Sequence, residues 1–281
     1  MFRHKRNFLK GAIVGVTALL LSVGTANAER TEPLEVTHNH THQQMYPSFL
    51  GGVVEYFPLR SLAELAGMRT DRVAVNVEDT TYQGYQAIKV VVQDTHKAID
   101  NPLDPELRRQ EIAEGACDGC PFFNIGTRPF HNGTIEVDVA SGPLESFGFI
   151  GIFFRVKLNE NNPKNSQYEG FYLRPKFSAA DEPLRSFTAQ YFSKPDYPWY
   201  RLREEARGKY ESYADVEPGA WTKIRIEVFG EMARFYVNNN PEPVLVVDDL
   251  KNGADSMGTI GLYTEPDINA YFKNLKITHA P

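Results

Sequence analysis

The residues best suited to hold a ligand are Arg155, Tyr172, Arg174 and Gln190, which come from three neighbouring β-like segments. Aromatic rings stack on the C–H faces of pyranosides, and Arg and Gln side chains form hydrogen bonds with hydroxyl groups. Because side chains alternate between the two faces of a strand, we expect these four on the polar face of one sheet. This chemistry predicts a carbohydrate or a glycan-like ligand.

Two further residues extend this candidate site. Trp199 lies in the Pro-rich segment KPDYPWYRL (194–202), which we expect to form a loop that overhangs the groove. Arg225 lies on the polar face of WTKIRIEV (221–228), opposite the core-facing Ile and Val residues.

The same arginines have a structural interpretation. Arg155 and Arg174 can form ion pairs with acidic side chains of the same sheets, namely Glu136, Asp138 or Glu227. Paired arginines are common on sheets, because the guanidinium group matches a carboxylate in shape. The residues alone leave ligand binding and structural pairing both open.

A framework of short strands must position these side chains, and the sequence predicts one. Segments rich in β-branched and aromatic residues, many with period-two alternation, recur between turn residues. The segments are VAVNVED (73–79), YQAIKVVVQD (85–94), GTIEVDV (133–139), GFIGIFFRV (148–156), YEGFYLRP (168–175), WTKIRIEVFG (221–230), ARFYVNN (233–239), GTIGLY (258–263) and YFKNLKI (271–277). Such a chain is all-β.

The order GTIEVDV, GIFFR, YEGFYLRP, PGAWTKIRIEV and YFKNLKI resembles the concanavalin A-like lectin/glucanase superfamily. Within it, the chain is similar to exported bacterial domains of the laminin-G-like and 3-keto-disaccharide-hydrolase-like type. The resemblance implies a two-sheet antiparallel jelly-roll sandwich, here with a short helical insertion. It also implies binding of, or action on, sugars at one curved sheet face.

The resemblance also directs attention to Glu136 and Asp138 as catalytic candidates. Glucanases of this superfamily carry a nucleophile and an acid on one strand, with the carboxyl groups about 5–5.5 Å apart. Glu136 and Asp138 match the leading acids of that pattern, but the second catalytic position falls on Ala140 or Ser141. A glucanase with that pair is therefore disfavoured, and catalysis stays an open question.

Residues 1–28 have the pattern of a signal peptide. A basic start with Arg3, Lys5, Arg6 and Lys10 precedes a short apolar run and the cleavage sequence Ala-Asn-Ala at 26–28. We expect cleavage after Ala28 and a periplasmic or extracellular protein, with no membrane insertion of the mature chain. Removal of four basic and no acidic residues takes the net charge from −6 to −10, which argues against a nucleic-acid partner.

The mature chain is long enough for one large domain. We expect a flexible polar tail at 29–50, followed by a single β-sandwich domain at 51–281 with an insertion at about 101–130. The histidines of THNHTH (37–42) suit either a metal-binding tail or a solvated one, and we favour the solvated tail.

Cys117 and Cys120, in CDGC, are the two cysteines of the chain. In an exported protein such a pair is expected to form a local disulfide. A thioredoxin-like redox motif is the alternative, and we disfavour it because the pair precedes Pro121 rather than opening a helix after a strand.

No cofactor is predicted from the sequence. A calcium ion held by loop oxygens near Asp248 or Asp255 is an alternative that we do not predict. The function favoured by these observations is carbohydrate binding by an exported β-sandwich, with a glycoside hydrolase and a protein-interaction module as the two alternatives. The oligomeric state is left open.

Overall fold

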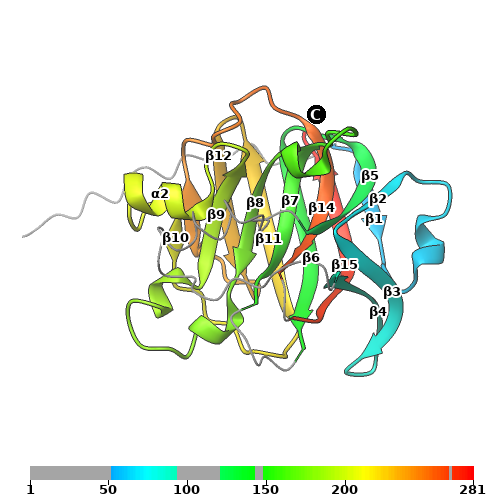
Figure 1. The fold of residues 1–281 in the computed structure, drawn as a ribbon, viewed down its shortest axis with the longest axis horizontal. Coiled ribbons are helices and arrows are strands. Elements are labelled where there is room, and N and C mark those ends of the chain that lie inside the picture. The colour runs from blue at the N-terminus through cyan, green and yellow to red at the C-terminus, as the bar shows by residue number, and fades with distance from the viewer. Residues whose placement is uncertain (1–51, 94–120, 143–147, 266–267) are drawn as a thin grey trace, which may run out of the picture. The chain divides into compact units, whose positions relative to one another are not determined.

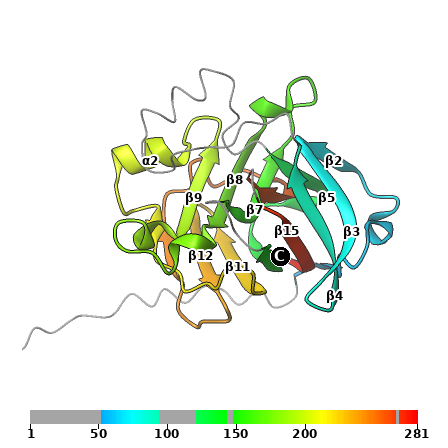
Figure 2. The ribbon, with the colours of Figure 1, turned by 60° about the horizontal axis from the view of Figure 1, so that its bottom comes forward.

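The computed structural model describes residues 52–93, 121–142, 148–265 and 268–281, which belong to one compact unit, 47–281. The described residues form two antiparallel sheets that pack face to face, as Figures 1 and 2 show. The predicted all-β, two-sheet jelly-roll sandwich is confirmed. The signal peptide, the histidine segment, the helix expected in the insertion, Cys117 and Cys120 lie outside the described residues.

One sheet, called sheet A, has the strand order β13-β12-β11-β6-β15-β4-β3, and β1 also pairs with β15. Its strands are β1 (Val54–Phe57), β3 (Val75–Tyr82), β4 (Tyr85–Val92), β6 (Gly133–Ser141), β11 (Thr222–Phe229), β12 (Met232–Val237), β13 (Leu245–Val247) and β15 (Ala270–His279). The other, sheet B, has the order β10-β9-β8-β7-β14-β5-β2. Its strands are β2 (Thr70–Val73), β5 (Phe122–Phe130), β7 (Ile150–Lys157), β8 (Gln167–Leu173), β9 (Ala189–Lys194), β10 (Glu211–Ser212) and β14 (Gly258–Thr264).

Alternation of side chains builds the core between the sheets. In β6 and β11 the buried residues Ile135, Val137, Ile224 and Ile226 alternate with partly exposed polar ones. From sheet B, Phe171 stacks on Phe235 of sheet A with the ring centroids 5.1 Å apart. One face of each sheet is therefore apolar and packs against the other sheet, as the sequence predicts. The opposite faces point away from this core.

The helices are few and short in the described part of the chain. The single α-helix there is α2 (Trp199–Glu205), which lies beside β9 and β10 in Figure 1. Four 3₁₀ turns accompany it: Leu62–Leu65, Pro163–Asn165, Pro175–Phe177 and Arg185–Phe187. The segment 194–202 is thus not wholly the loop that we expected, because residues from Trp199 onward form α2, with Pro198 as its N-cap residue.

The predicted insertion at about 101–130 is too long at its C-terminal end. Residues 122–130 form β5, which pairs with β14 on one side and with β2 on the other. Asn124 and Gly126 obscure the strand pattern in the sequence, yet Phe122, Phe123 and Ile125 are buried. Tertiary pairing therefore determines this strand more than its local composition does.

Candidate ligand-binding site

The outer face of sheet B carries a row of side chains on paired strands. Tyr263 pairs with Gly151, which pairs with Tyr172, which pairs with Gln190, which pairs with Glu211. Directly paired residues of neighbouring strands point to the same face. The row therefore brings one amide, one carboxylate and two tyrosines from separate parts of the chain onto one face of sheet B, where all four are buried.

The glycine in this row makes room for the rings beside it. A Cβ at Gly151 would lie 2.6 Å from the Cβ of Tyr172 and 2.2 Å from the carbonyl oxygen of Phe171. Gly170 is equivalent, since its Cβ would lie 2.6 Å from Cδ1 of Phe153. Both positions need glycine because a ring or a backbone group occupies the space of the missing side chain.

Arg174 lies at the end of β8 and is completely buried. Its Nη1 donates a hydrogen bond to the carbonyl oxygen of Phe187 at 2.6 Å, and its Nη2 donates to the Tyr172 hydroxyl at 2.6 Å. The Gln190 Oε1 is 3.4 Å from each of these nitrogens. The guanidinium carbon lies 4.6 Å from the Phe149 ring centroid. Among the described residues, every hydrogen-bond acceptor of this cation is neutral.

Arg203, on α2, lies beside Arg174 and is paired with Glu211. Its Nε and Nη2 donate to the Glu211 Oε2 at 2.8 and 2.7 Å. The guanidinium carbon is 3.8 Å from the Phe187 ring centroid and 4.6 Å from that of Trp199. Cation–π contacts of this kind gain strength where water is excluded. Two arginines thus lie between aromatic rings, with one carboxylate bonded to one of them.

We call this group the Arg174 cluster. Its members are the polar and aromatic residues just described around the two guanidinium groups, namely Phe149, Tyr172, Arg174, Phe187, Gln190, Trp199, Arg203 and Glu211.

Three buried polar atoms of the Arg174 cluster have no hydrogen-bond partner among the described residues. They are the Nε of Arg174, the Nε1 of Trp199 and the Oε1 of Glu211. A buried donor or acceptor without a partner costs about 1–3 kcal/mol, more when it is charged. Most buried polar groups in folded proteins are paired, so three unpaired ones in one cluster require an explanation.

Burial also changes the electrostatics of the cluster. Removal of water lowers the pKa of Arg174, and the neighbouring charge of Arg203 lowers it further, while Tyr172 and Glu211 oppose the change. The guanidinium stays protonated, because arginine is the most strongly basic side chain. The consequence is a buried cation that is held less favourably than it would be in water.

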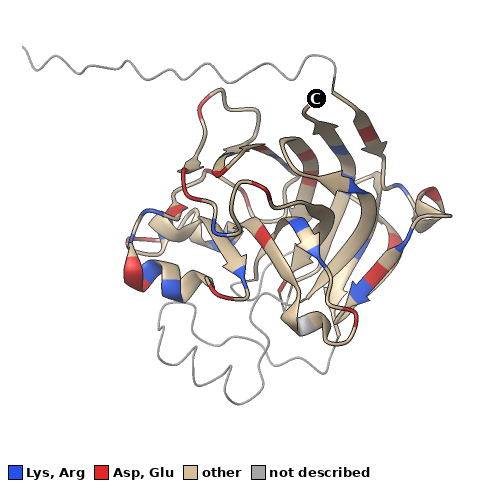
Figure 3. Cartoon of the chain, turned by 90° about the horizontal axis from the view of Figure 1, so that it is seen from above, with Lys and Arg blue, Asp and Glu red and all other residues tan. Residues whose placement is uncertain are grey.

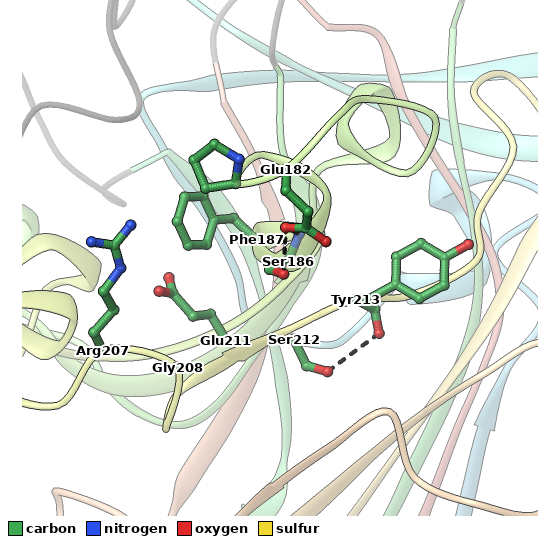
Figure 4. Close-up of a pocket in the computed structure, with 9 residues that line it drawn as sticks. Glu182, Ser186, Phe187, Arg207, Gly208, Glu211, Ser212 and Tyr213 are labelled. Atoms are coloured by element: carbon green, nitrogen blue, oxygen red, sulfur yellow. Dashed lines mark hydrogen bonds between the residues drawn. The ribbon is translucent and has the colours of Figure 1, made fainter. Parts of the chain in front are cut away.

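An open pocket borders the Arg174 cluster. It has a volume of about 460 Å³, and Glu211 and Phe187 belong both to its lining and to the cluster. Figure 4 shows the Glu211 carboxylate between the Arg207 side chain and the Phe187 ring. Arg207 is exposed, so the pocket opens to solvent at the β10 edge of sheet B.

Arg155, which we expected beside Tyr172 and Arg174, points to the other side of sheet B. The pairing of β7 with β8 shifts register between Phe154 and Lys157, and Arg155 has φ of 54°. This β-bulge interrupts the alternation and turns the side chain inward. Its Nη1 lies 3.2 Å from Glu169 Oε2, and both side chains are completely buried. For Arg155 the structural interpretation is therefore correct, although the partner is Glu169.

The other sequence candidates lie on the outer face of sheet A. Glu136 bonds Lys276 at 3.0 Å, and Asp138 accepts a 2.7 Å hydrogen bond from the amide of Asn274. Asp138 also pairs with Lys223 at 3.1 Å. The structure therefore places these two acids on the opposite sheet from the Arg174 cluster, so they do not share a site with it.

Arg225 lies on this same face of sheet A. It forms an ion pair with Glu227, and its guanidinium carbon is 3.6 Å from the Tyr236 ring centroid. Figure 3 shows basic and acidic residues interspersed along the described strands in that view. Net charge thus does not single out a face, and side-chain geometry has to define the site.

Of the predicted ligand contacts, the structure brings together Tyr172, Arg174, Gln190 and Trp199. It adds Phe149, Phe187, Arg203 and Glu211, which were not among the predicted ligand contacts. Arg203 and Glu211 come from a short helix and a two-residue strand. The alternation of apolar and polar residues in REEARGKYESY is too weak to signal either element, although the cationic and acidic residues themselves were visible.

No group of three or more His, Cys, Asp or Glu side chains that could hold a metal ion occurs among the described residues. Asp248 pairs with Lys209 at 3.2 Å. Asp249 accepts hydrogen bonds from Lys251 and Tyr210, and these outweigh the opposing effect of burial and lower its pKa. Across the same part of the chain, no helix is both long and apolar enough to span a membrane.

The chain is similar in sequence to one family of known proteins and in structure to several solved proteins. The family of 3-keto-alpha-glucoside-1,2-lyase-like domains matches residues 81–278. No curated protein sequence matches the chain.

Three solved structures are similar to this chain. The carbohydrate-binding module CBM66 from Bacillus subtilis is 14% identical, with 75% of this chain and 98% of that chain covered and a TM-score of 0.47. A Bacillus subtilis protein of unknown function with a galectin-like fold is 12% identical, covering 80% and 94%, with a TM-score of 0.48. Domain 4 of the arabinanase AbnA from Geobacillus stearothermophilus, in complex with arabinotriose, is 10% identical, covering 80% and 91%, with a TM-score of 0.42.

Proposed function

Since the chain belongs to the family of 3-keto-alpha-glucoside-1,2-lyase-like domains, and is thus a carbohydrate-related β-sandwich, we propose that it binds a saccharide at the Arg174 cluster on the outer face of sheet B. The observation that carries this proposal is the set of unpaired buried atoms. Two are donors, on Arg174 and Trp199, and one is an acceptor, on Glu211. A sugar hydroxyl both donates and accepts hydrogen bonds, so one class of ligand satisfies all three atoms.

The aromatic rings of the cluster support the same class of ligand. Phe149 stacks on Tyr172 with the ring centroids 5.0 Å apart, and Tyr172 packs edge-on against Tyr263. Rings of this kind provide flat apolar surfaces for the C–H face of a pyranose, while the polar atoms orient its hydroxyls. The combination of apolar walls and a few directed polar groups is typical of small-molecule sites.

The pocket beside the cluster supports a route for the ligand. Its volume of about 460 Å³ is within the usual range for ligand sites. Glu211 lies at the junction, with Oε2 bonded to Arg203 and Oε1 unpaired. A saccharide in this pocket would therefore lie next to the buried, unpaired carboxylate oxygen of Glu211.

The test is titration calorimetry of the full chain against saccharides selected on a glycan array. Replacement Trp199→Phe keeps a ring and removes one donor, so we expect about 2–10-fold weaker binding, as for one hydrogen bond. Arg225→Gln is the matched control, because Arg225 also covers a tyrosine ring but on sheet A. Absence of any saccharide binding at millimolar concentration contradicts the proposal, and capture of a protein partner instead supports the interaction-module alternative.

A second candidate function is cleavage of a 3-keto glucoside. In such a sugar the C2 proton is acidic because it lies next to the ketone, and its removal by a base allows the C1 oxygen substituent to leave. The unpaired, buried Oε1 of Glu211 is the observation that favours this chemistry. Release of the leaving group from a 3-keto glucoside, lost in Glu211→Gln and unchanged in Glu136→Gln, supports it. Release that depends on Glu136 or Asp138 instead restores the candidates from the sequence.

We also propose that the chain is exported and cleaved after Ala28, on the sequence pattern of residues 1–28. Mass spectrometry of the protein from the native host, or from a bacterial host with the full chain expressed, is the test. A mature N-terminus at Glu29 in the periplasm or medium supports export. An intact N-terminus in the cytoplasm contradicts it.

A further inference from the structure

Aromatic rings surround one lysine on the outer face of sheet A, on the opposite sheet from the Arg174 cluster. The Nζ of Lys273 lies 3.4 Å from the ring centroid of Tyr85 and 4.3 Å from that of Trp221. Beside them Tyr82 stacks on Tyr271, with the ring centroids 4.0 Å apart. Tyr85 is 55% exposed, and the lysine and the other three rings are partly exposed. A small molecule in solution can therefore reach this group.

The tip of the β3–β4 hairpin forms one wall of the group. The pairing of β4 with β15 ends at Phe272. Beyond that point the tip is tied to the turn before β11, because the Tyr82 hydroxyl donates a 2.8 Å hydrogen bond to the carbonyl oxygen of Gly219. Tyr82 and Tyr85 are paired at the end of the hairpin, and both rings pack edge-on against Trp221. The hairpin thus adds rings from a separate part of the chain to the face of sheet A.

A β-bulge in β15 places Lys273 and Asn274 beside one carboxylate. The pairing of β15 with β6 shifts register after Lys273, and Asn274 has φ of 57°. Lys273 and Lys223 are both cross-strand partners of Asp138. The Oδ1 of Asp138 bonds Lys223 at 3.1 Å, and its Oδ2 accepts the amide of Asn274 at 2.7 Å. Two lysines therefore share one carboxylate, whose oxygens are bonded to Lys223 and Asn274. β-Bulges often lie next to functional sites, where they re-aim a side chain.

The environment of Lys273 disfavours its charged form. Burial lowers its pKa, Asp138 opposes this change, and the neighbouring charge of Lys223 lowers the pKa further. Lys251 shows the opposite balance, because its hydrogen bond to Asp249 outweighs the effect of burial and raises its pKa. A lysine that is desolvated and next to a second cation has a larger fraction of neutral amine, which is the nucleophilic form.

We propose that Lys273 is a nucleophilic amine that forms a Schiff base with the carbonyl group of a sugar, either the aldehyde of an open-chain sugar or the ketone of a keto sugar. The lone pair of the neutral Nζ attacks the carbonyl carbon, and the oxygen takes up a proton from the nitrogen to give a carbinolamine. The oxygen then leaves as water with the second proton of the nitrogen, and a C=N bond remains. The step consumes no oxidant or reductant. The rings of Tyr85 and Trp221 provide apolar surface for the C–H groups of the same molecule.

The test is reductive trapping on the full chain. The protein is incubated at neutral pH with sodium cyanoborohydride and either D-glyceraldehyde or methyl 3-keto-glucoside, and the modified lysines are mapped by mass spectrometry of peptides. Cyanoborohydride reduces the Schiff base to a stable secondary amine. At early times we expect about 10-fold more adduct on Lys273 than on the average of the other lysines, because more of it is neutral. Preferential adduct from glyceraldehyde identifies the aldehyde as the partner, and preferential adduct from the keto-glucoside identifies the ketone.

Three variants test the surroundings of the amine. Lys273→Arg keeps a cation on the rings and removes the amine, so the adduct at this position should be lost while labelling elsewhere is unchanged. Lys223→Gln removes the neighbouring charge and frees Asp138, so we expect several-fold less adduct on Lys273. Lys89→Gln is the matched control, because Lys89 is also a partly exposed lysine of sheet A and is paired with Glu78. It should leave the adduct on Lys273 unchanged.

Even labelling of all lysines overturns the inference, because it shows that the rings hold Lys273 as an ordinary ammonium group. Labelling that is greatest on an exposed lysine such as Lys276 overturns it as well. The wild-type map needs no variant, so the result stands even where a variant does not fold. This inference does not rest on saccharide binding at the Arg174 cluster. Trp199→Phe should therefore leave the adduct on Lys273 unchanged, and a loss of the adduct in that variant contradicts two separate sites.

Discussion

Arg155 and Arg174 are both completely buried arginines on sheet B, but their surroundings differ. Arg155 lies between the sheets and donates hydrogen bonds to Glu169 and to the carbonyl oxygens of His131, Gly230 and Gly253. Arg174 lies on the outer face, has neutral acceptors and keeps one unpaired nitrogen. The first arrangement is complete by itself and joins the two sheets. The second leaves one buried guanidinium nitrogen without a hydrogen-bond partner among the described residues.

The partner of Arg155, Glu169, is itself held by further hydrogen bonds. Glu169 also accepts hydrogen bonds from the Tyr191 hydroxyl at 2.7 Å and from the backbone N–H of Asn252 at 3.2 Å. Burial raises the pKa of Tyr191, and the Glu169 charge raises it further. Tyr191 therefore stays a protonated donor. A network whose members are all satisfied favours one packed structure over alternatives.

The largest expected effect is on the stability contributed by Arg155. In Arg155→Ala the buried Glu169 carboxylate loses its counter-charge, so we expect the free energy of unfolding to fall by about 3–5 kcal/mol. Urea denaturation followed by tryptophan fluorescence measures this. The double variant Arg155→Met with Glu169→Leu should recover much of the loss, because no charge is left unpaired. A loss below about 1 kcal/mol for Arg155→Ala would show that Arg155 contributes no more to stability than Arg174 does, and would contradict the difference drawn between them.

A smaller effect on stability is expected for Arg174. In Arg174→Met no carboxylate is left without a partner, since Glu211 keeps Arg203. We expect a loss of about 1–2 kcal/mol, from the Phe187 carbonyl that loses its donor. In the same urea series, saturating saccharide should stabilise the wild-type protein and not this variant. A loss as large as that of Arg155→Ala would instead indicate a purely structural role for Arg174.

The same comparison shows what the sequence could reveal. Alternation along β6, β8 and β11 predicted the strands and their buried faces, because burial on one face imposes a period of two. Tyr172, Arg174 and Gln190 were correctly grouped for this reason. Arg155 was placed on the wrong face, because a β-bulge adds a residue and resets the alternation after Phe154.

The missing members of the site had no comparable signal. Glu211 reaches the row of Tyr172 and Gln190 through a strand of two residues, and Arg203 through a helix of seven. Their proximity to Arg174 follows from how these short elements pack on β9, which is a tertiary property. Local patterns cannot encode a contact between segments that are separated in the chain, so this part of the site needed coordinates.

The smallest effect is expected on sheet A, where Glu136 and Asp138 form partly exposed ion pairs. Such pairs contribute about 0–1 kcal/mol because water screens them and their side chains lose freedom on pairing. The double variant Glu136→Gln with Asp138→Asn should thus lower the free energy of unfolding by less than about 1 kcal/mol and leave saccharide affinity unchanged. Urea denaturation and calorimetry check both halves. A marked loss of saccharide affinity at wild-type stability would place the binding site on sheet A. The unpaired buried atoms around Arg174 would then not be explained by saccharide binding.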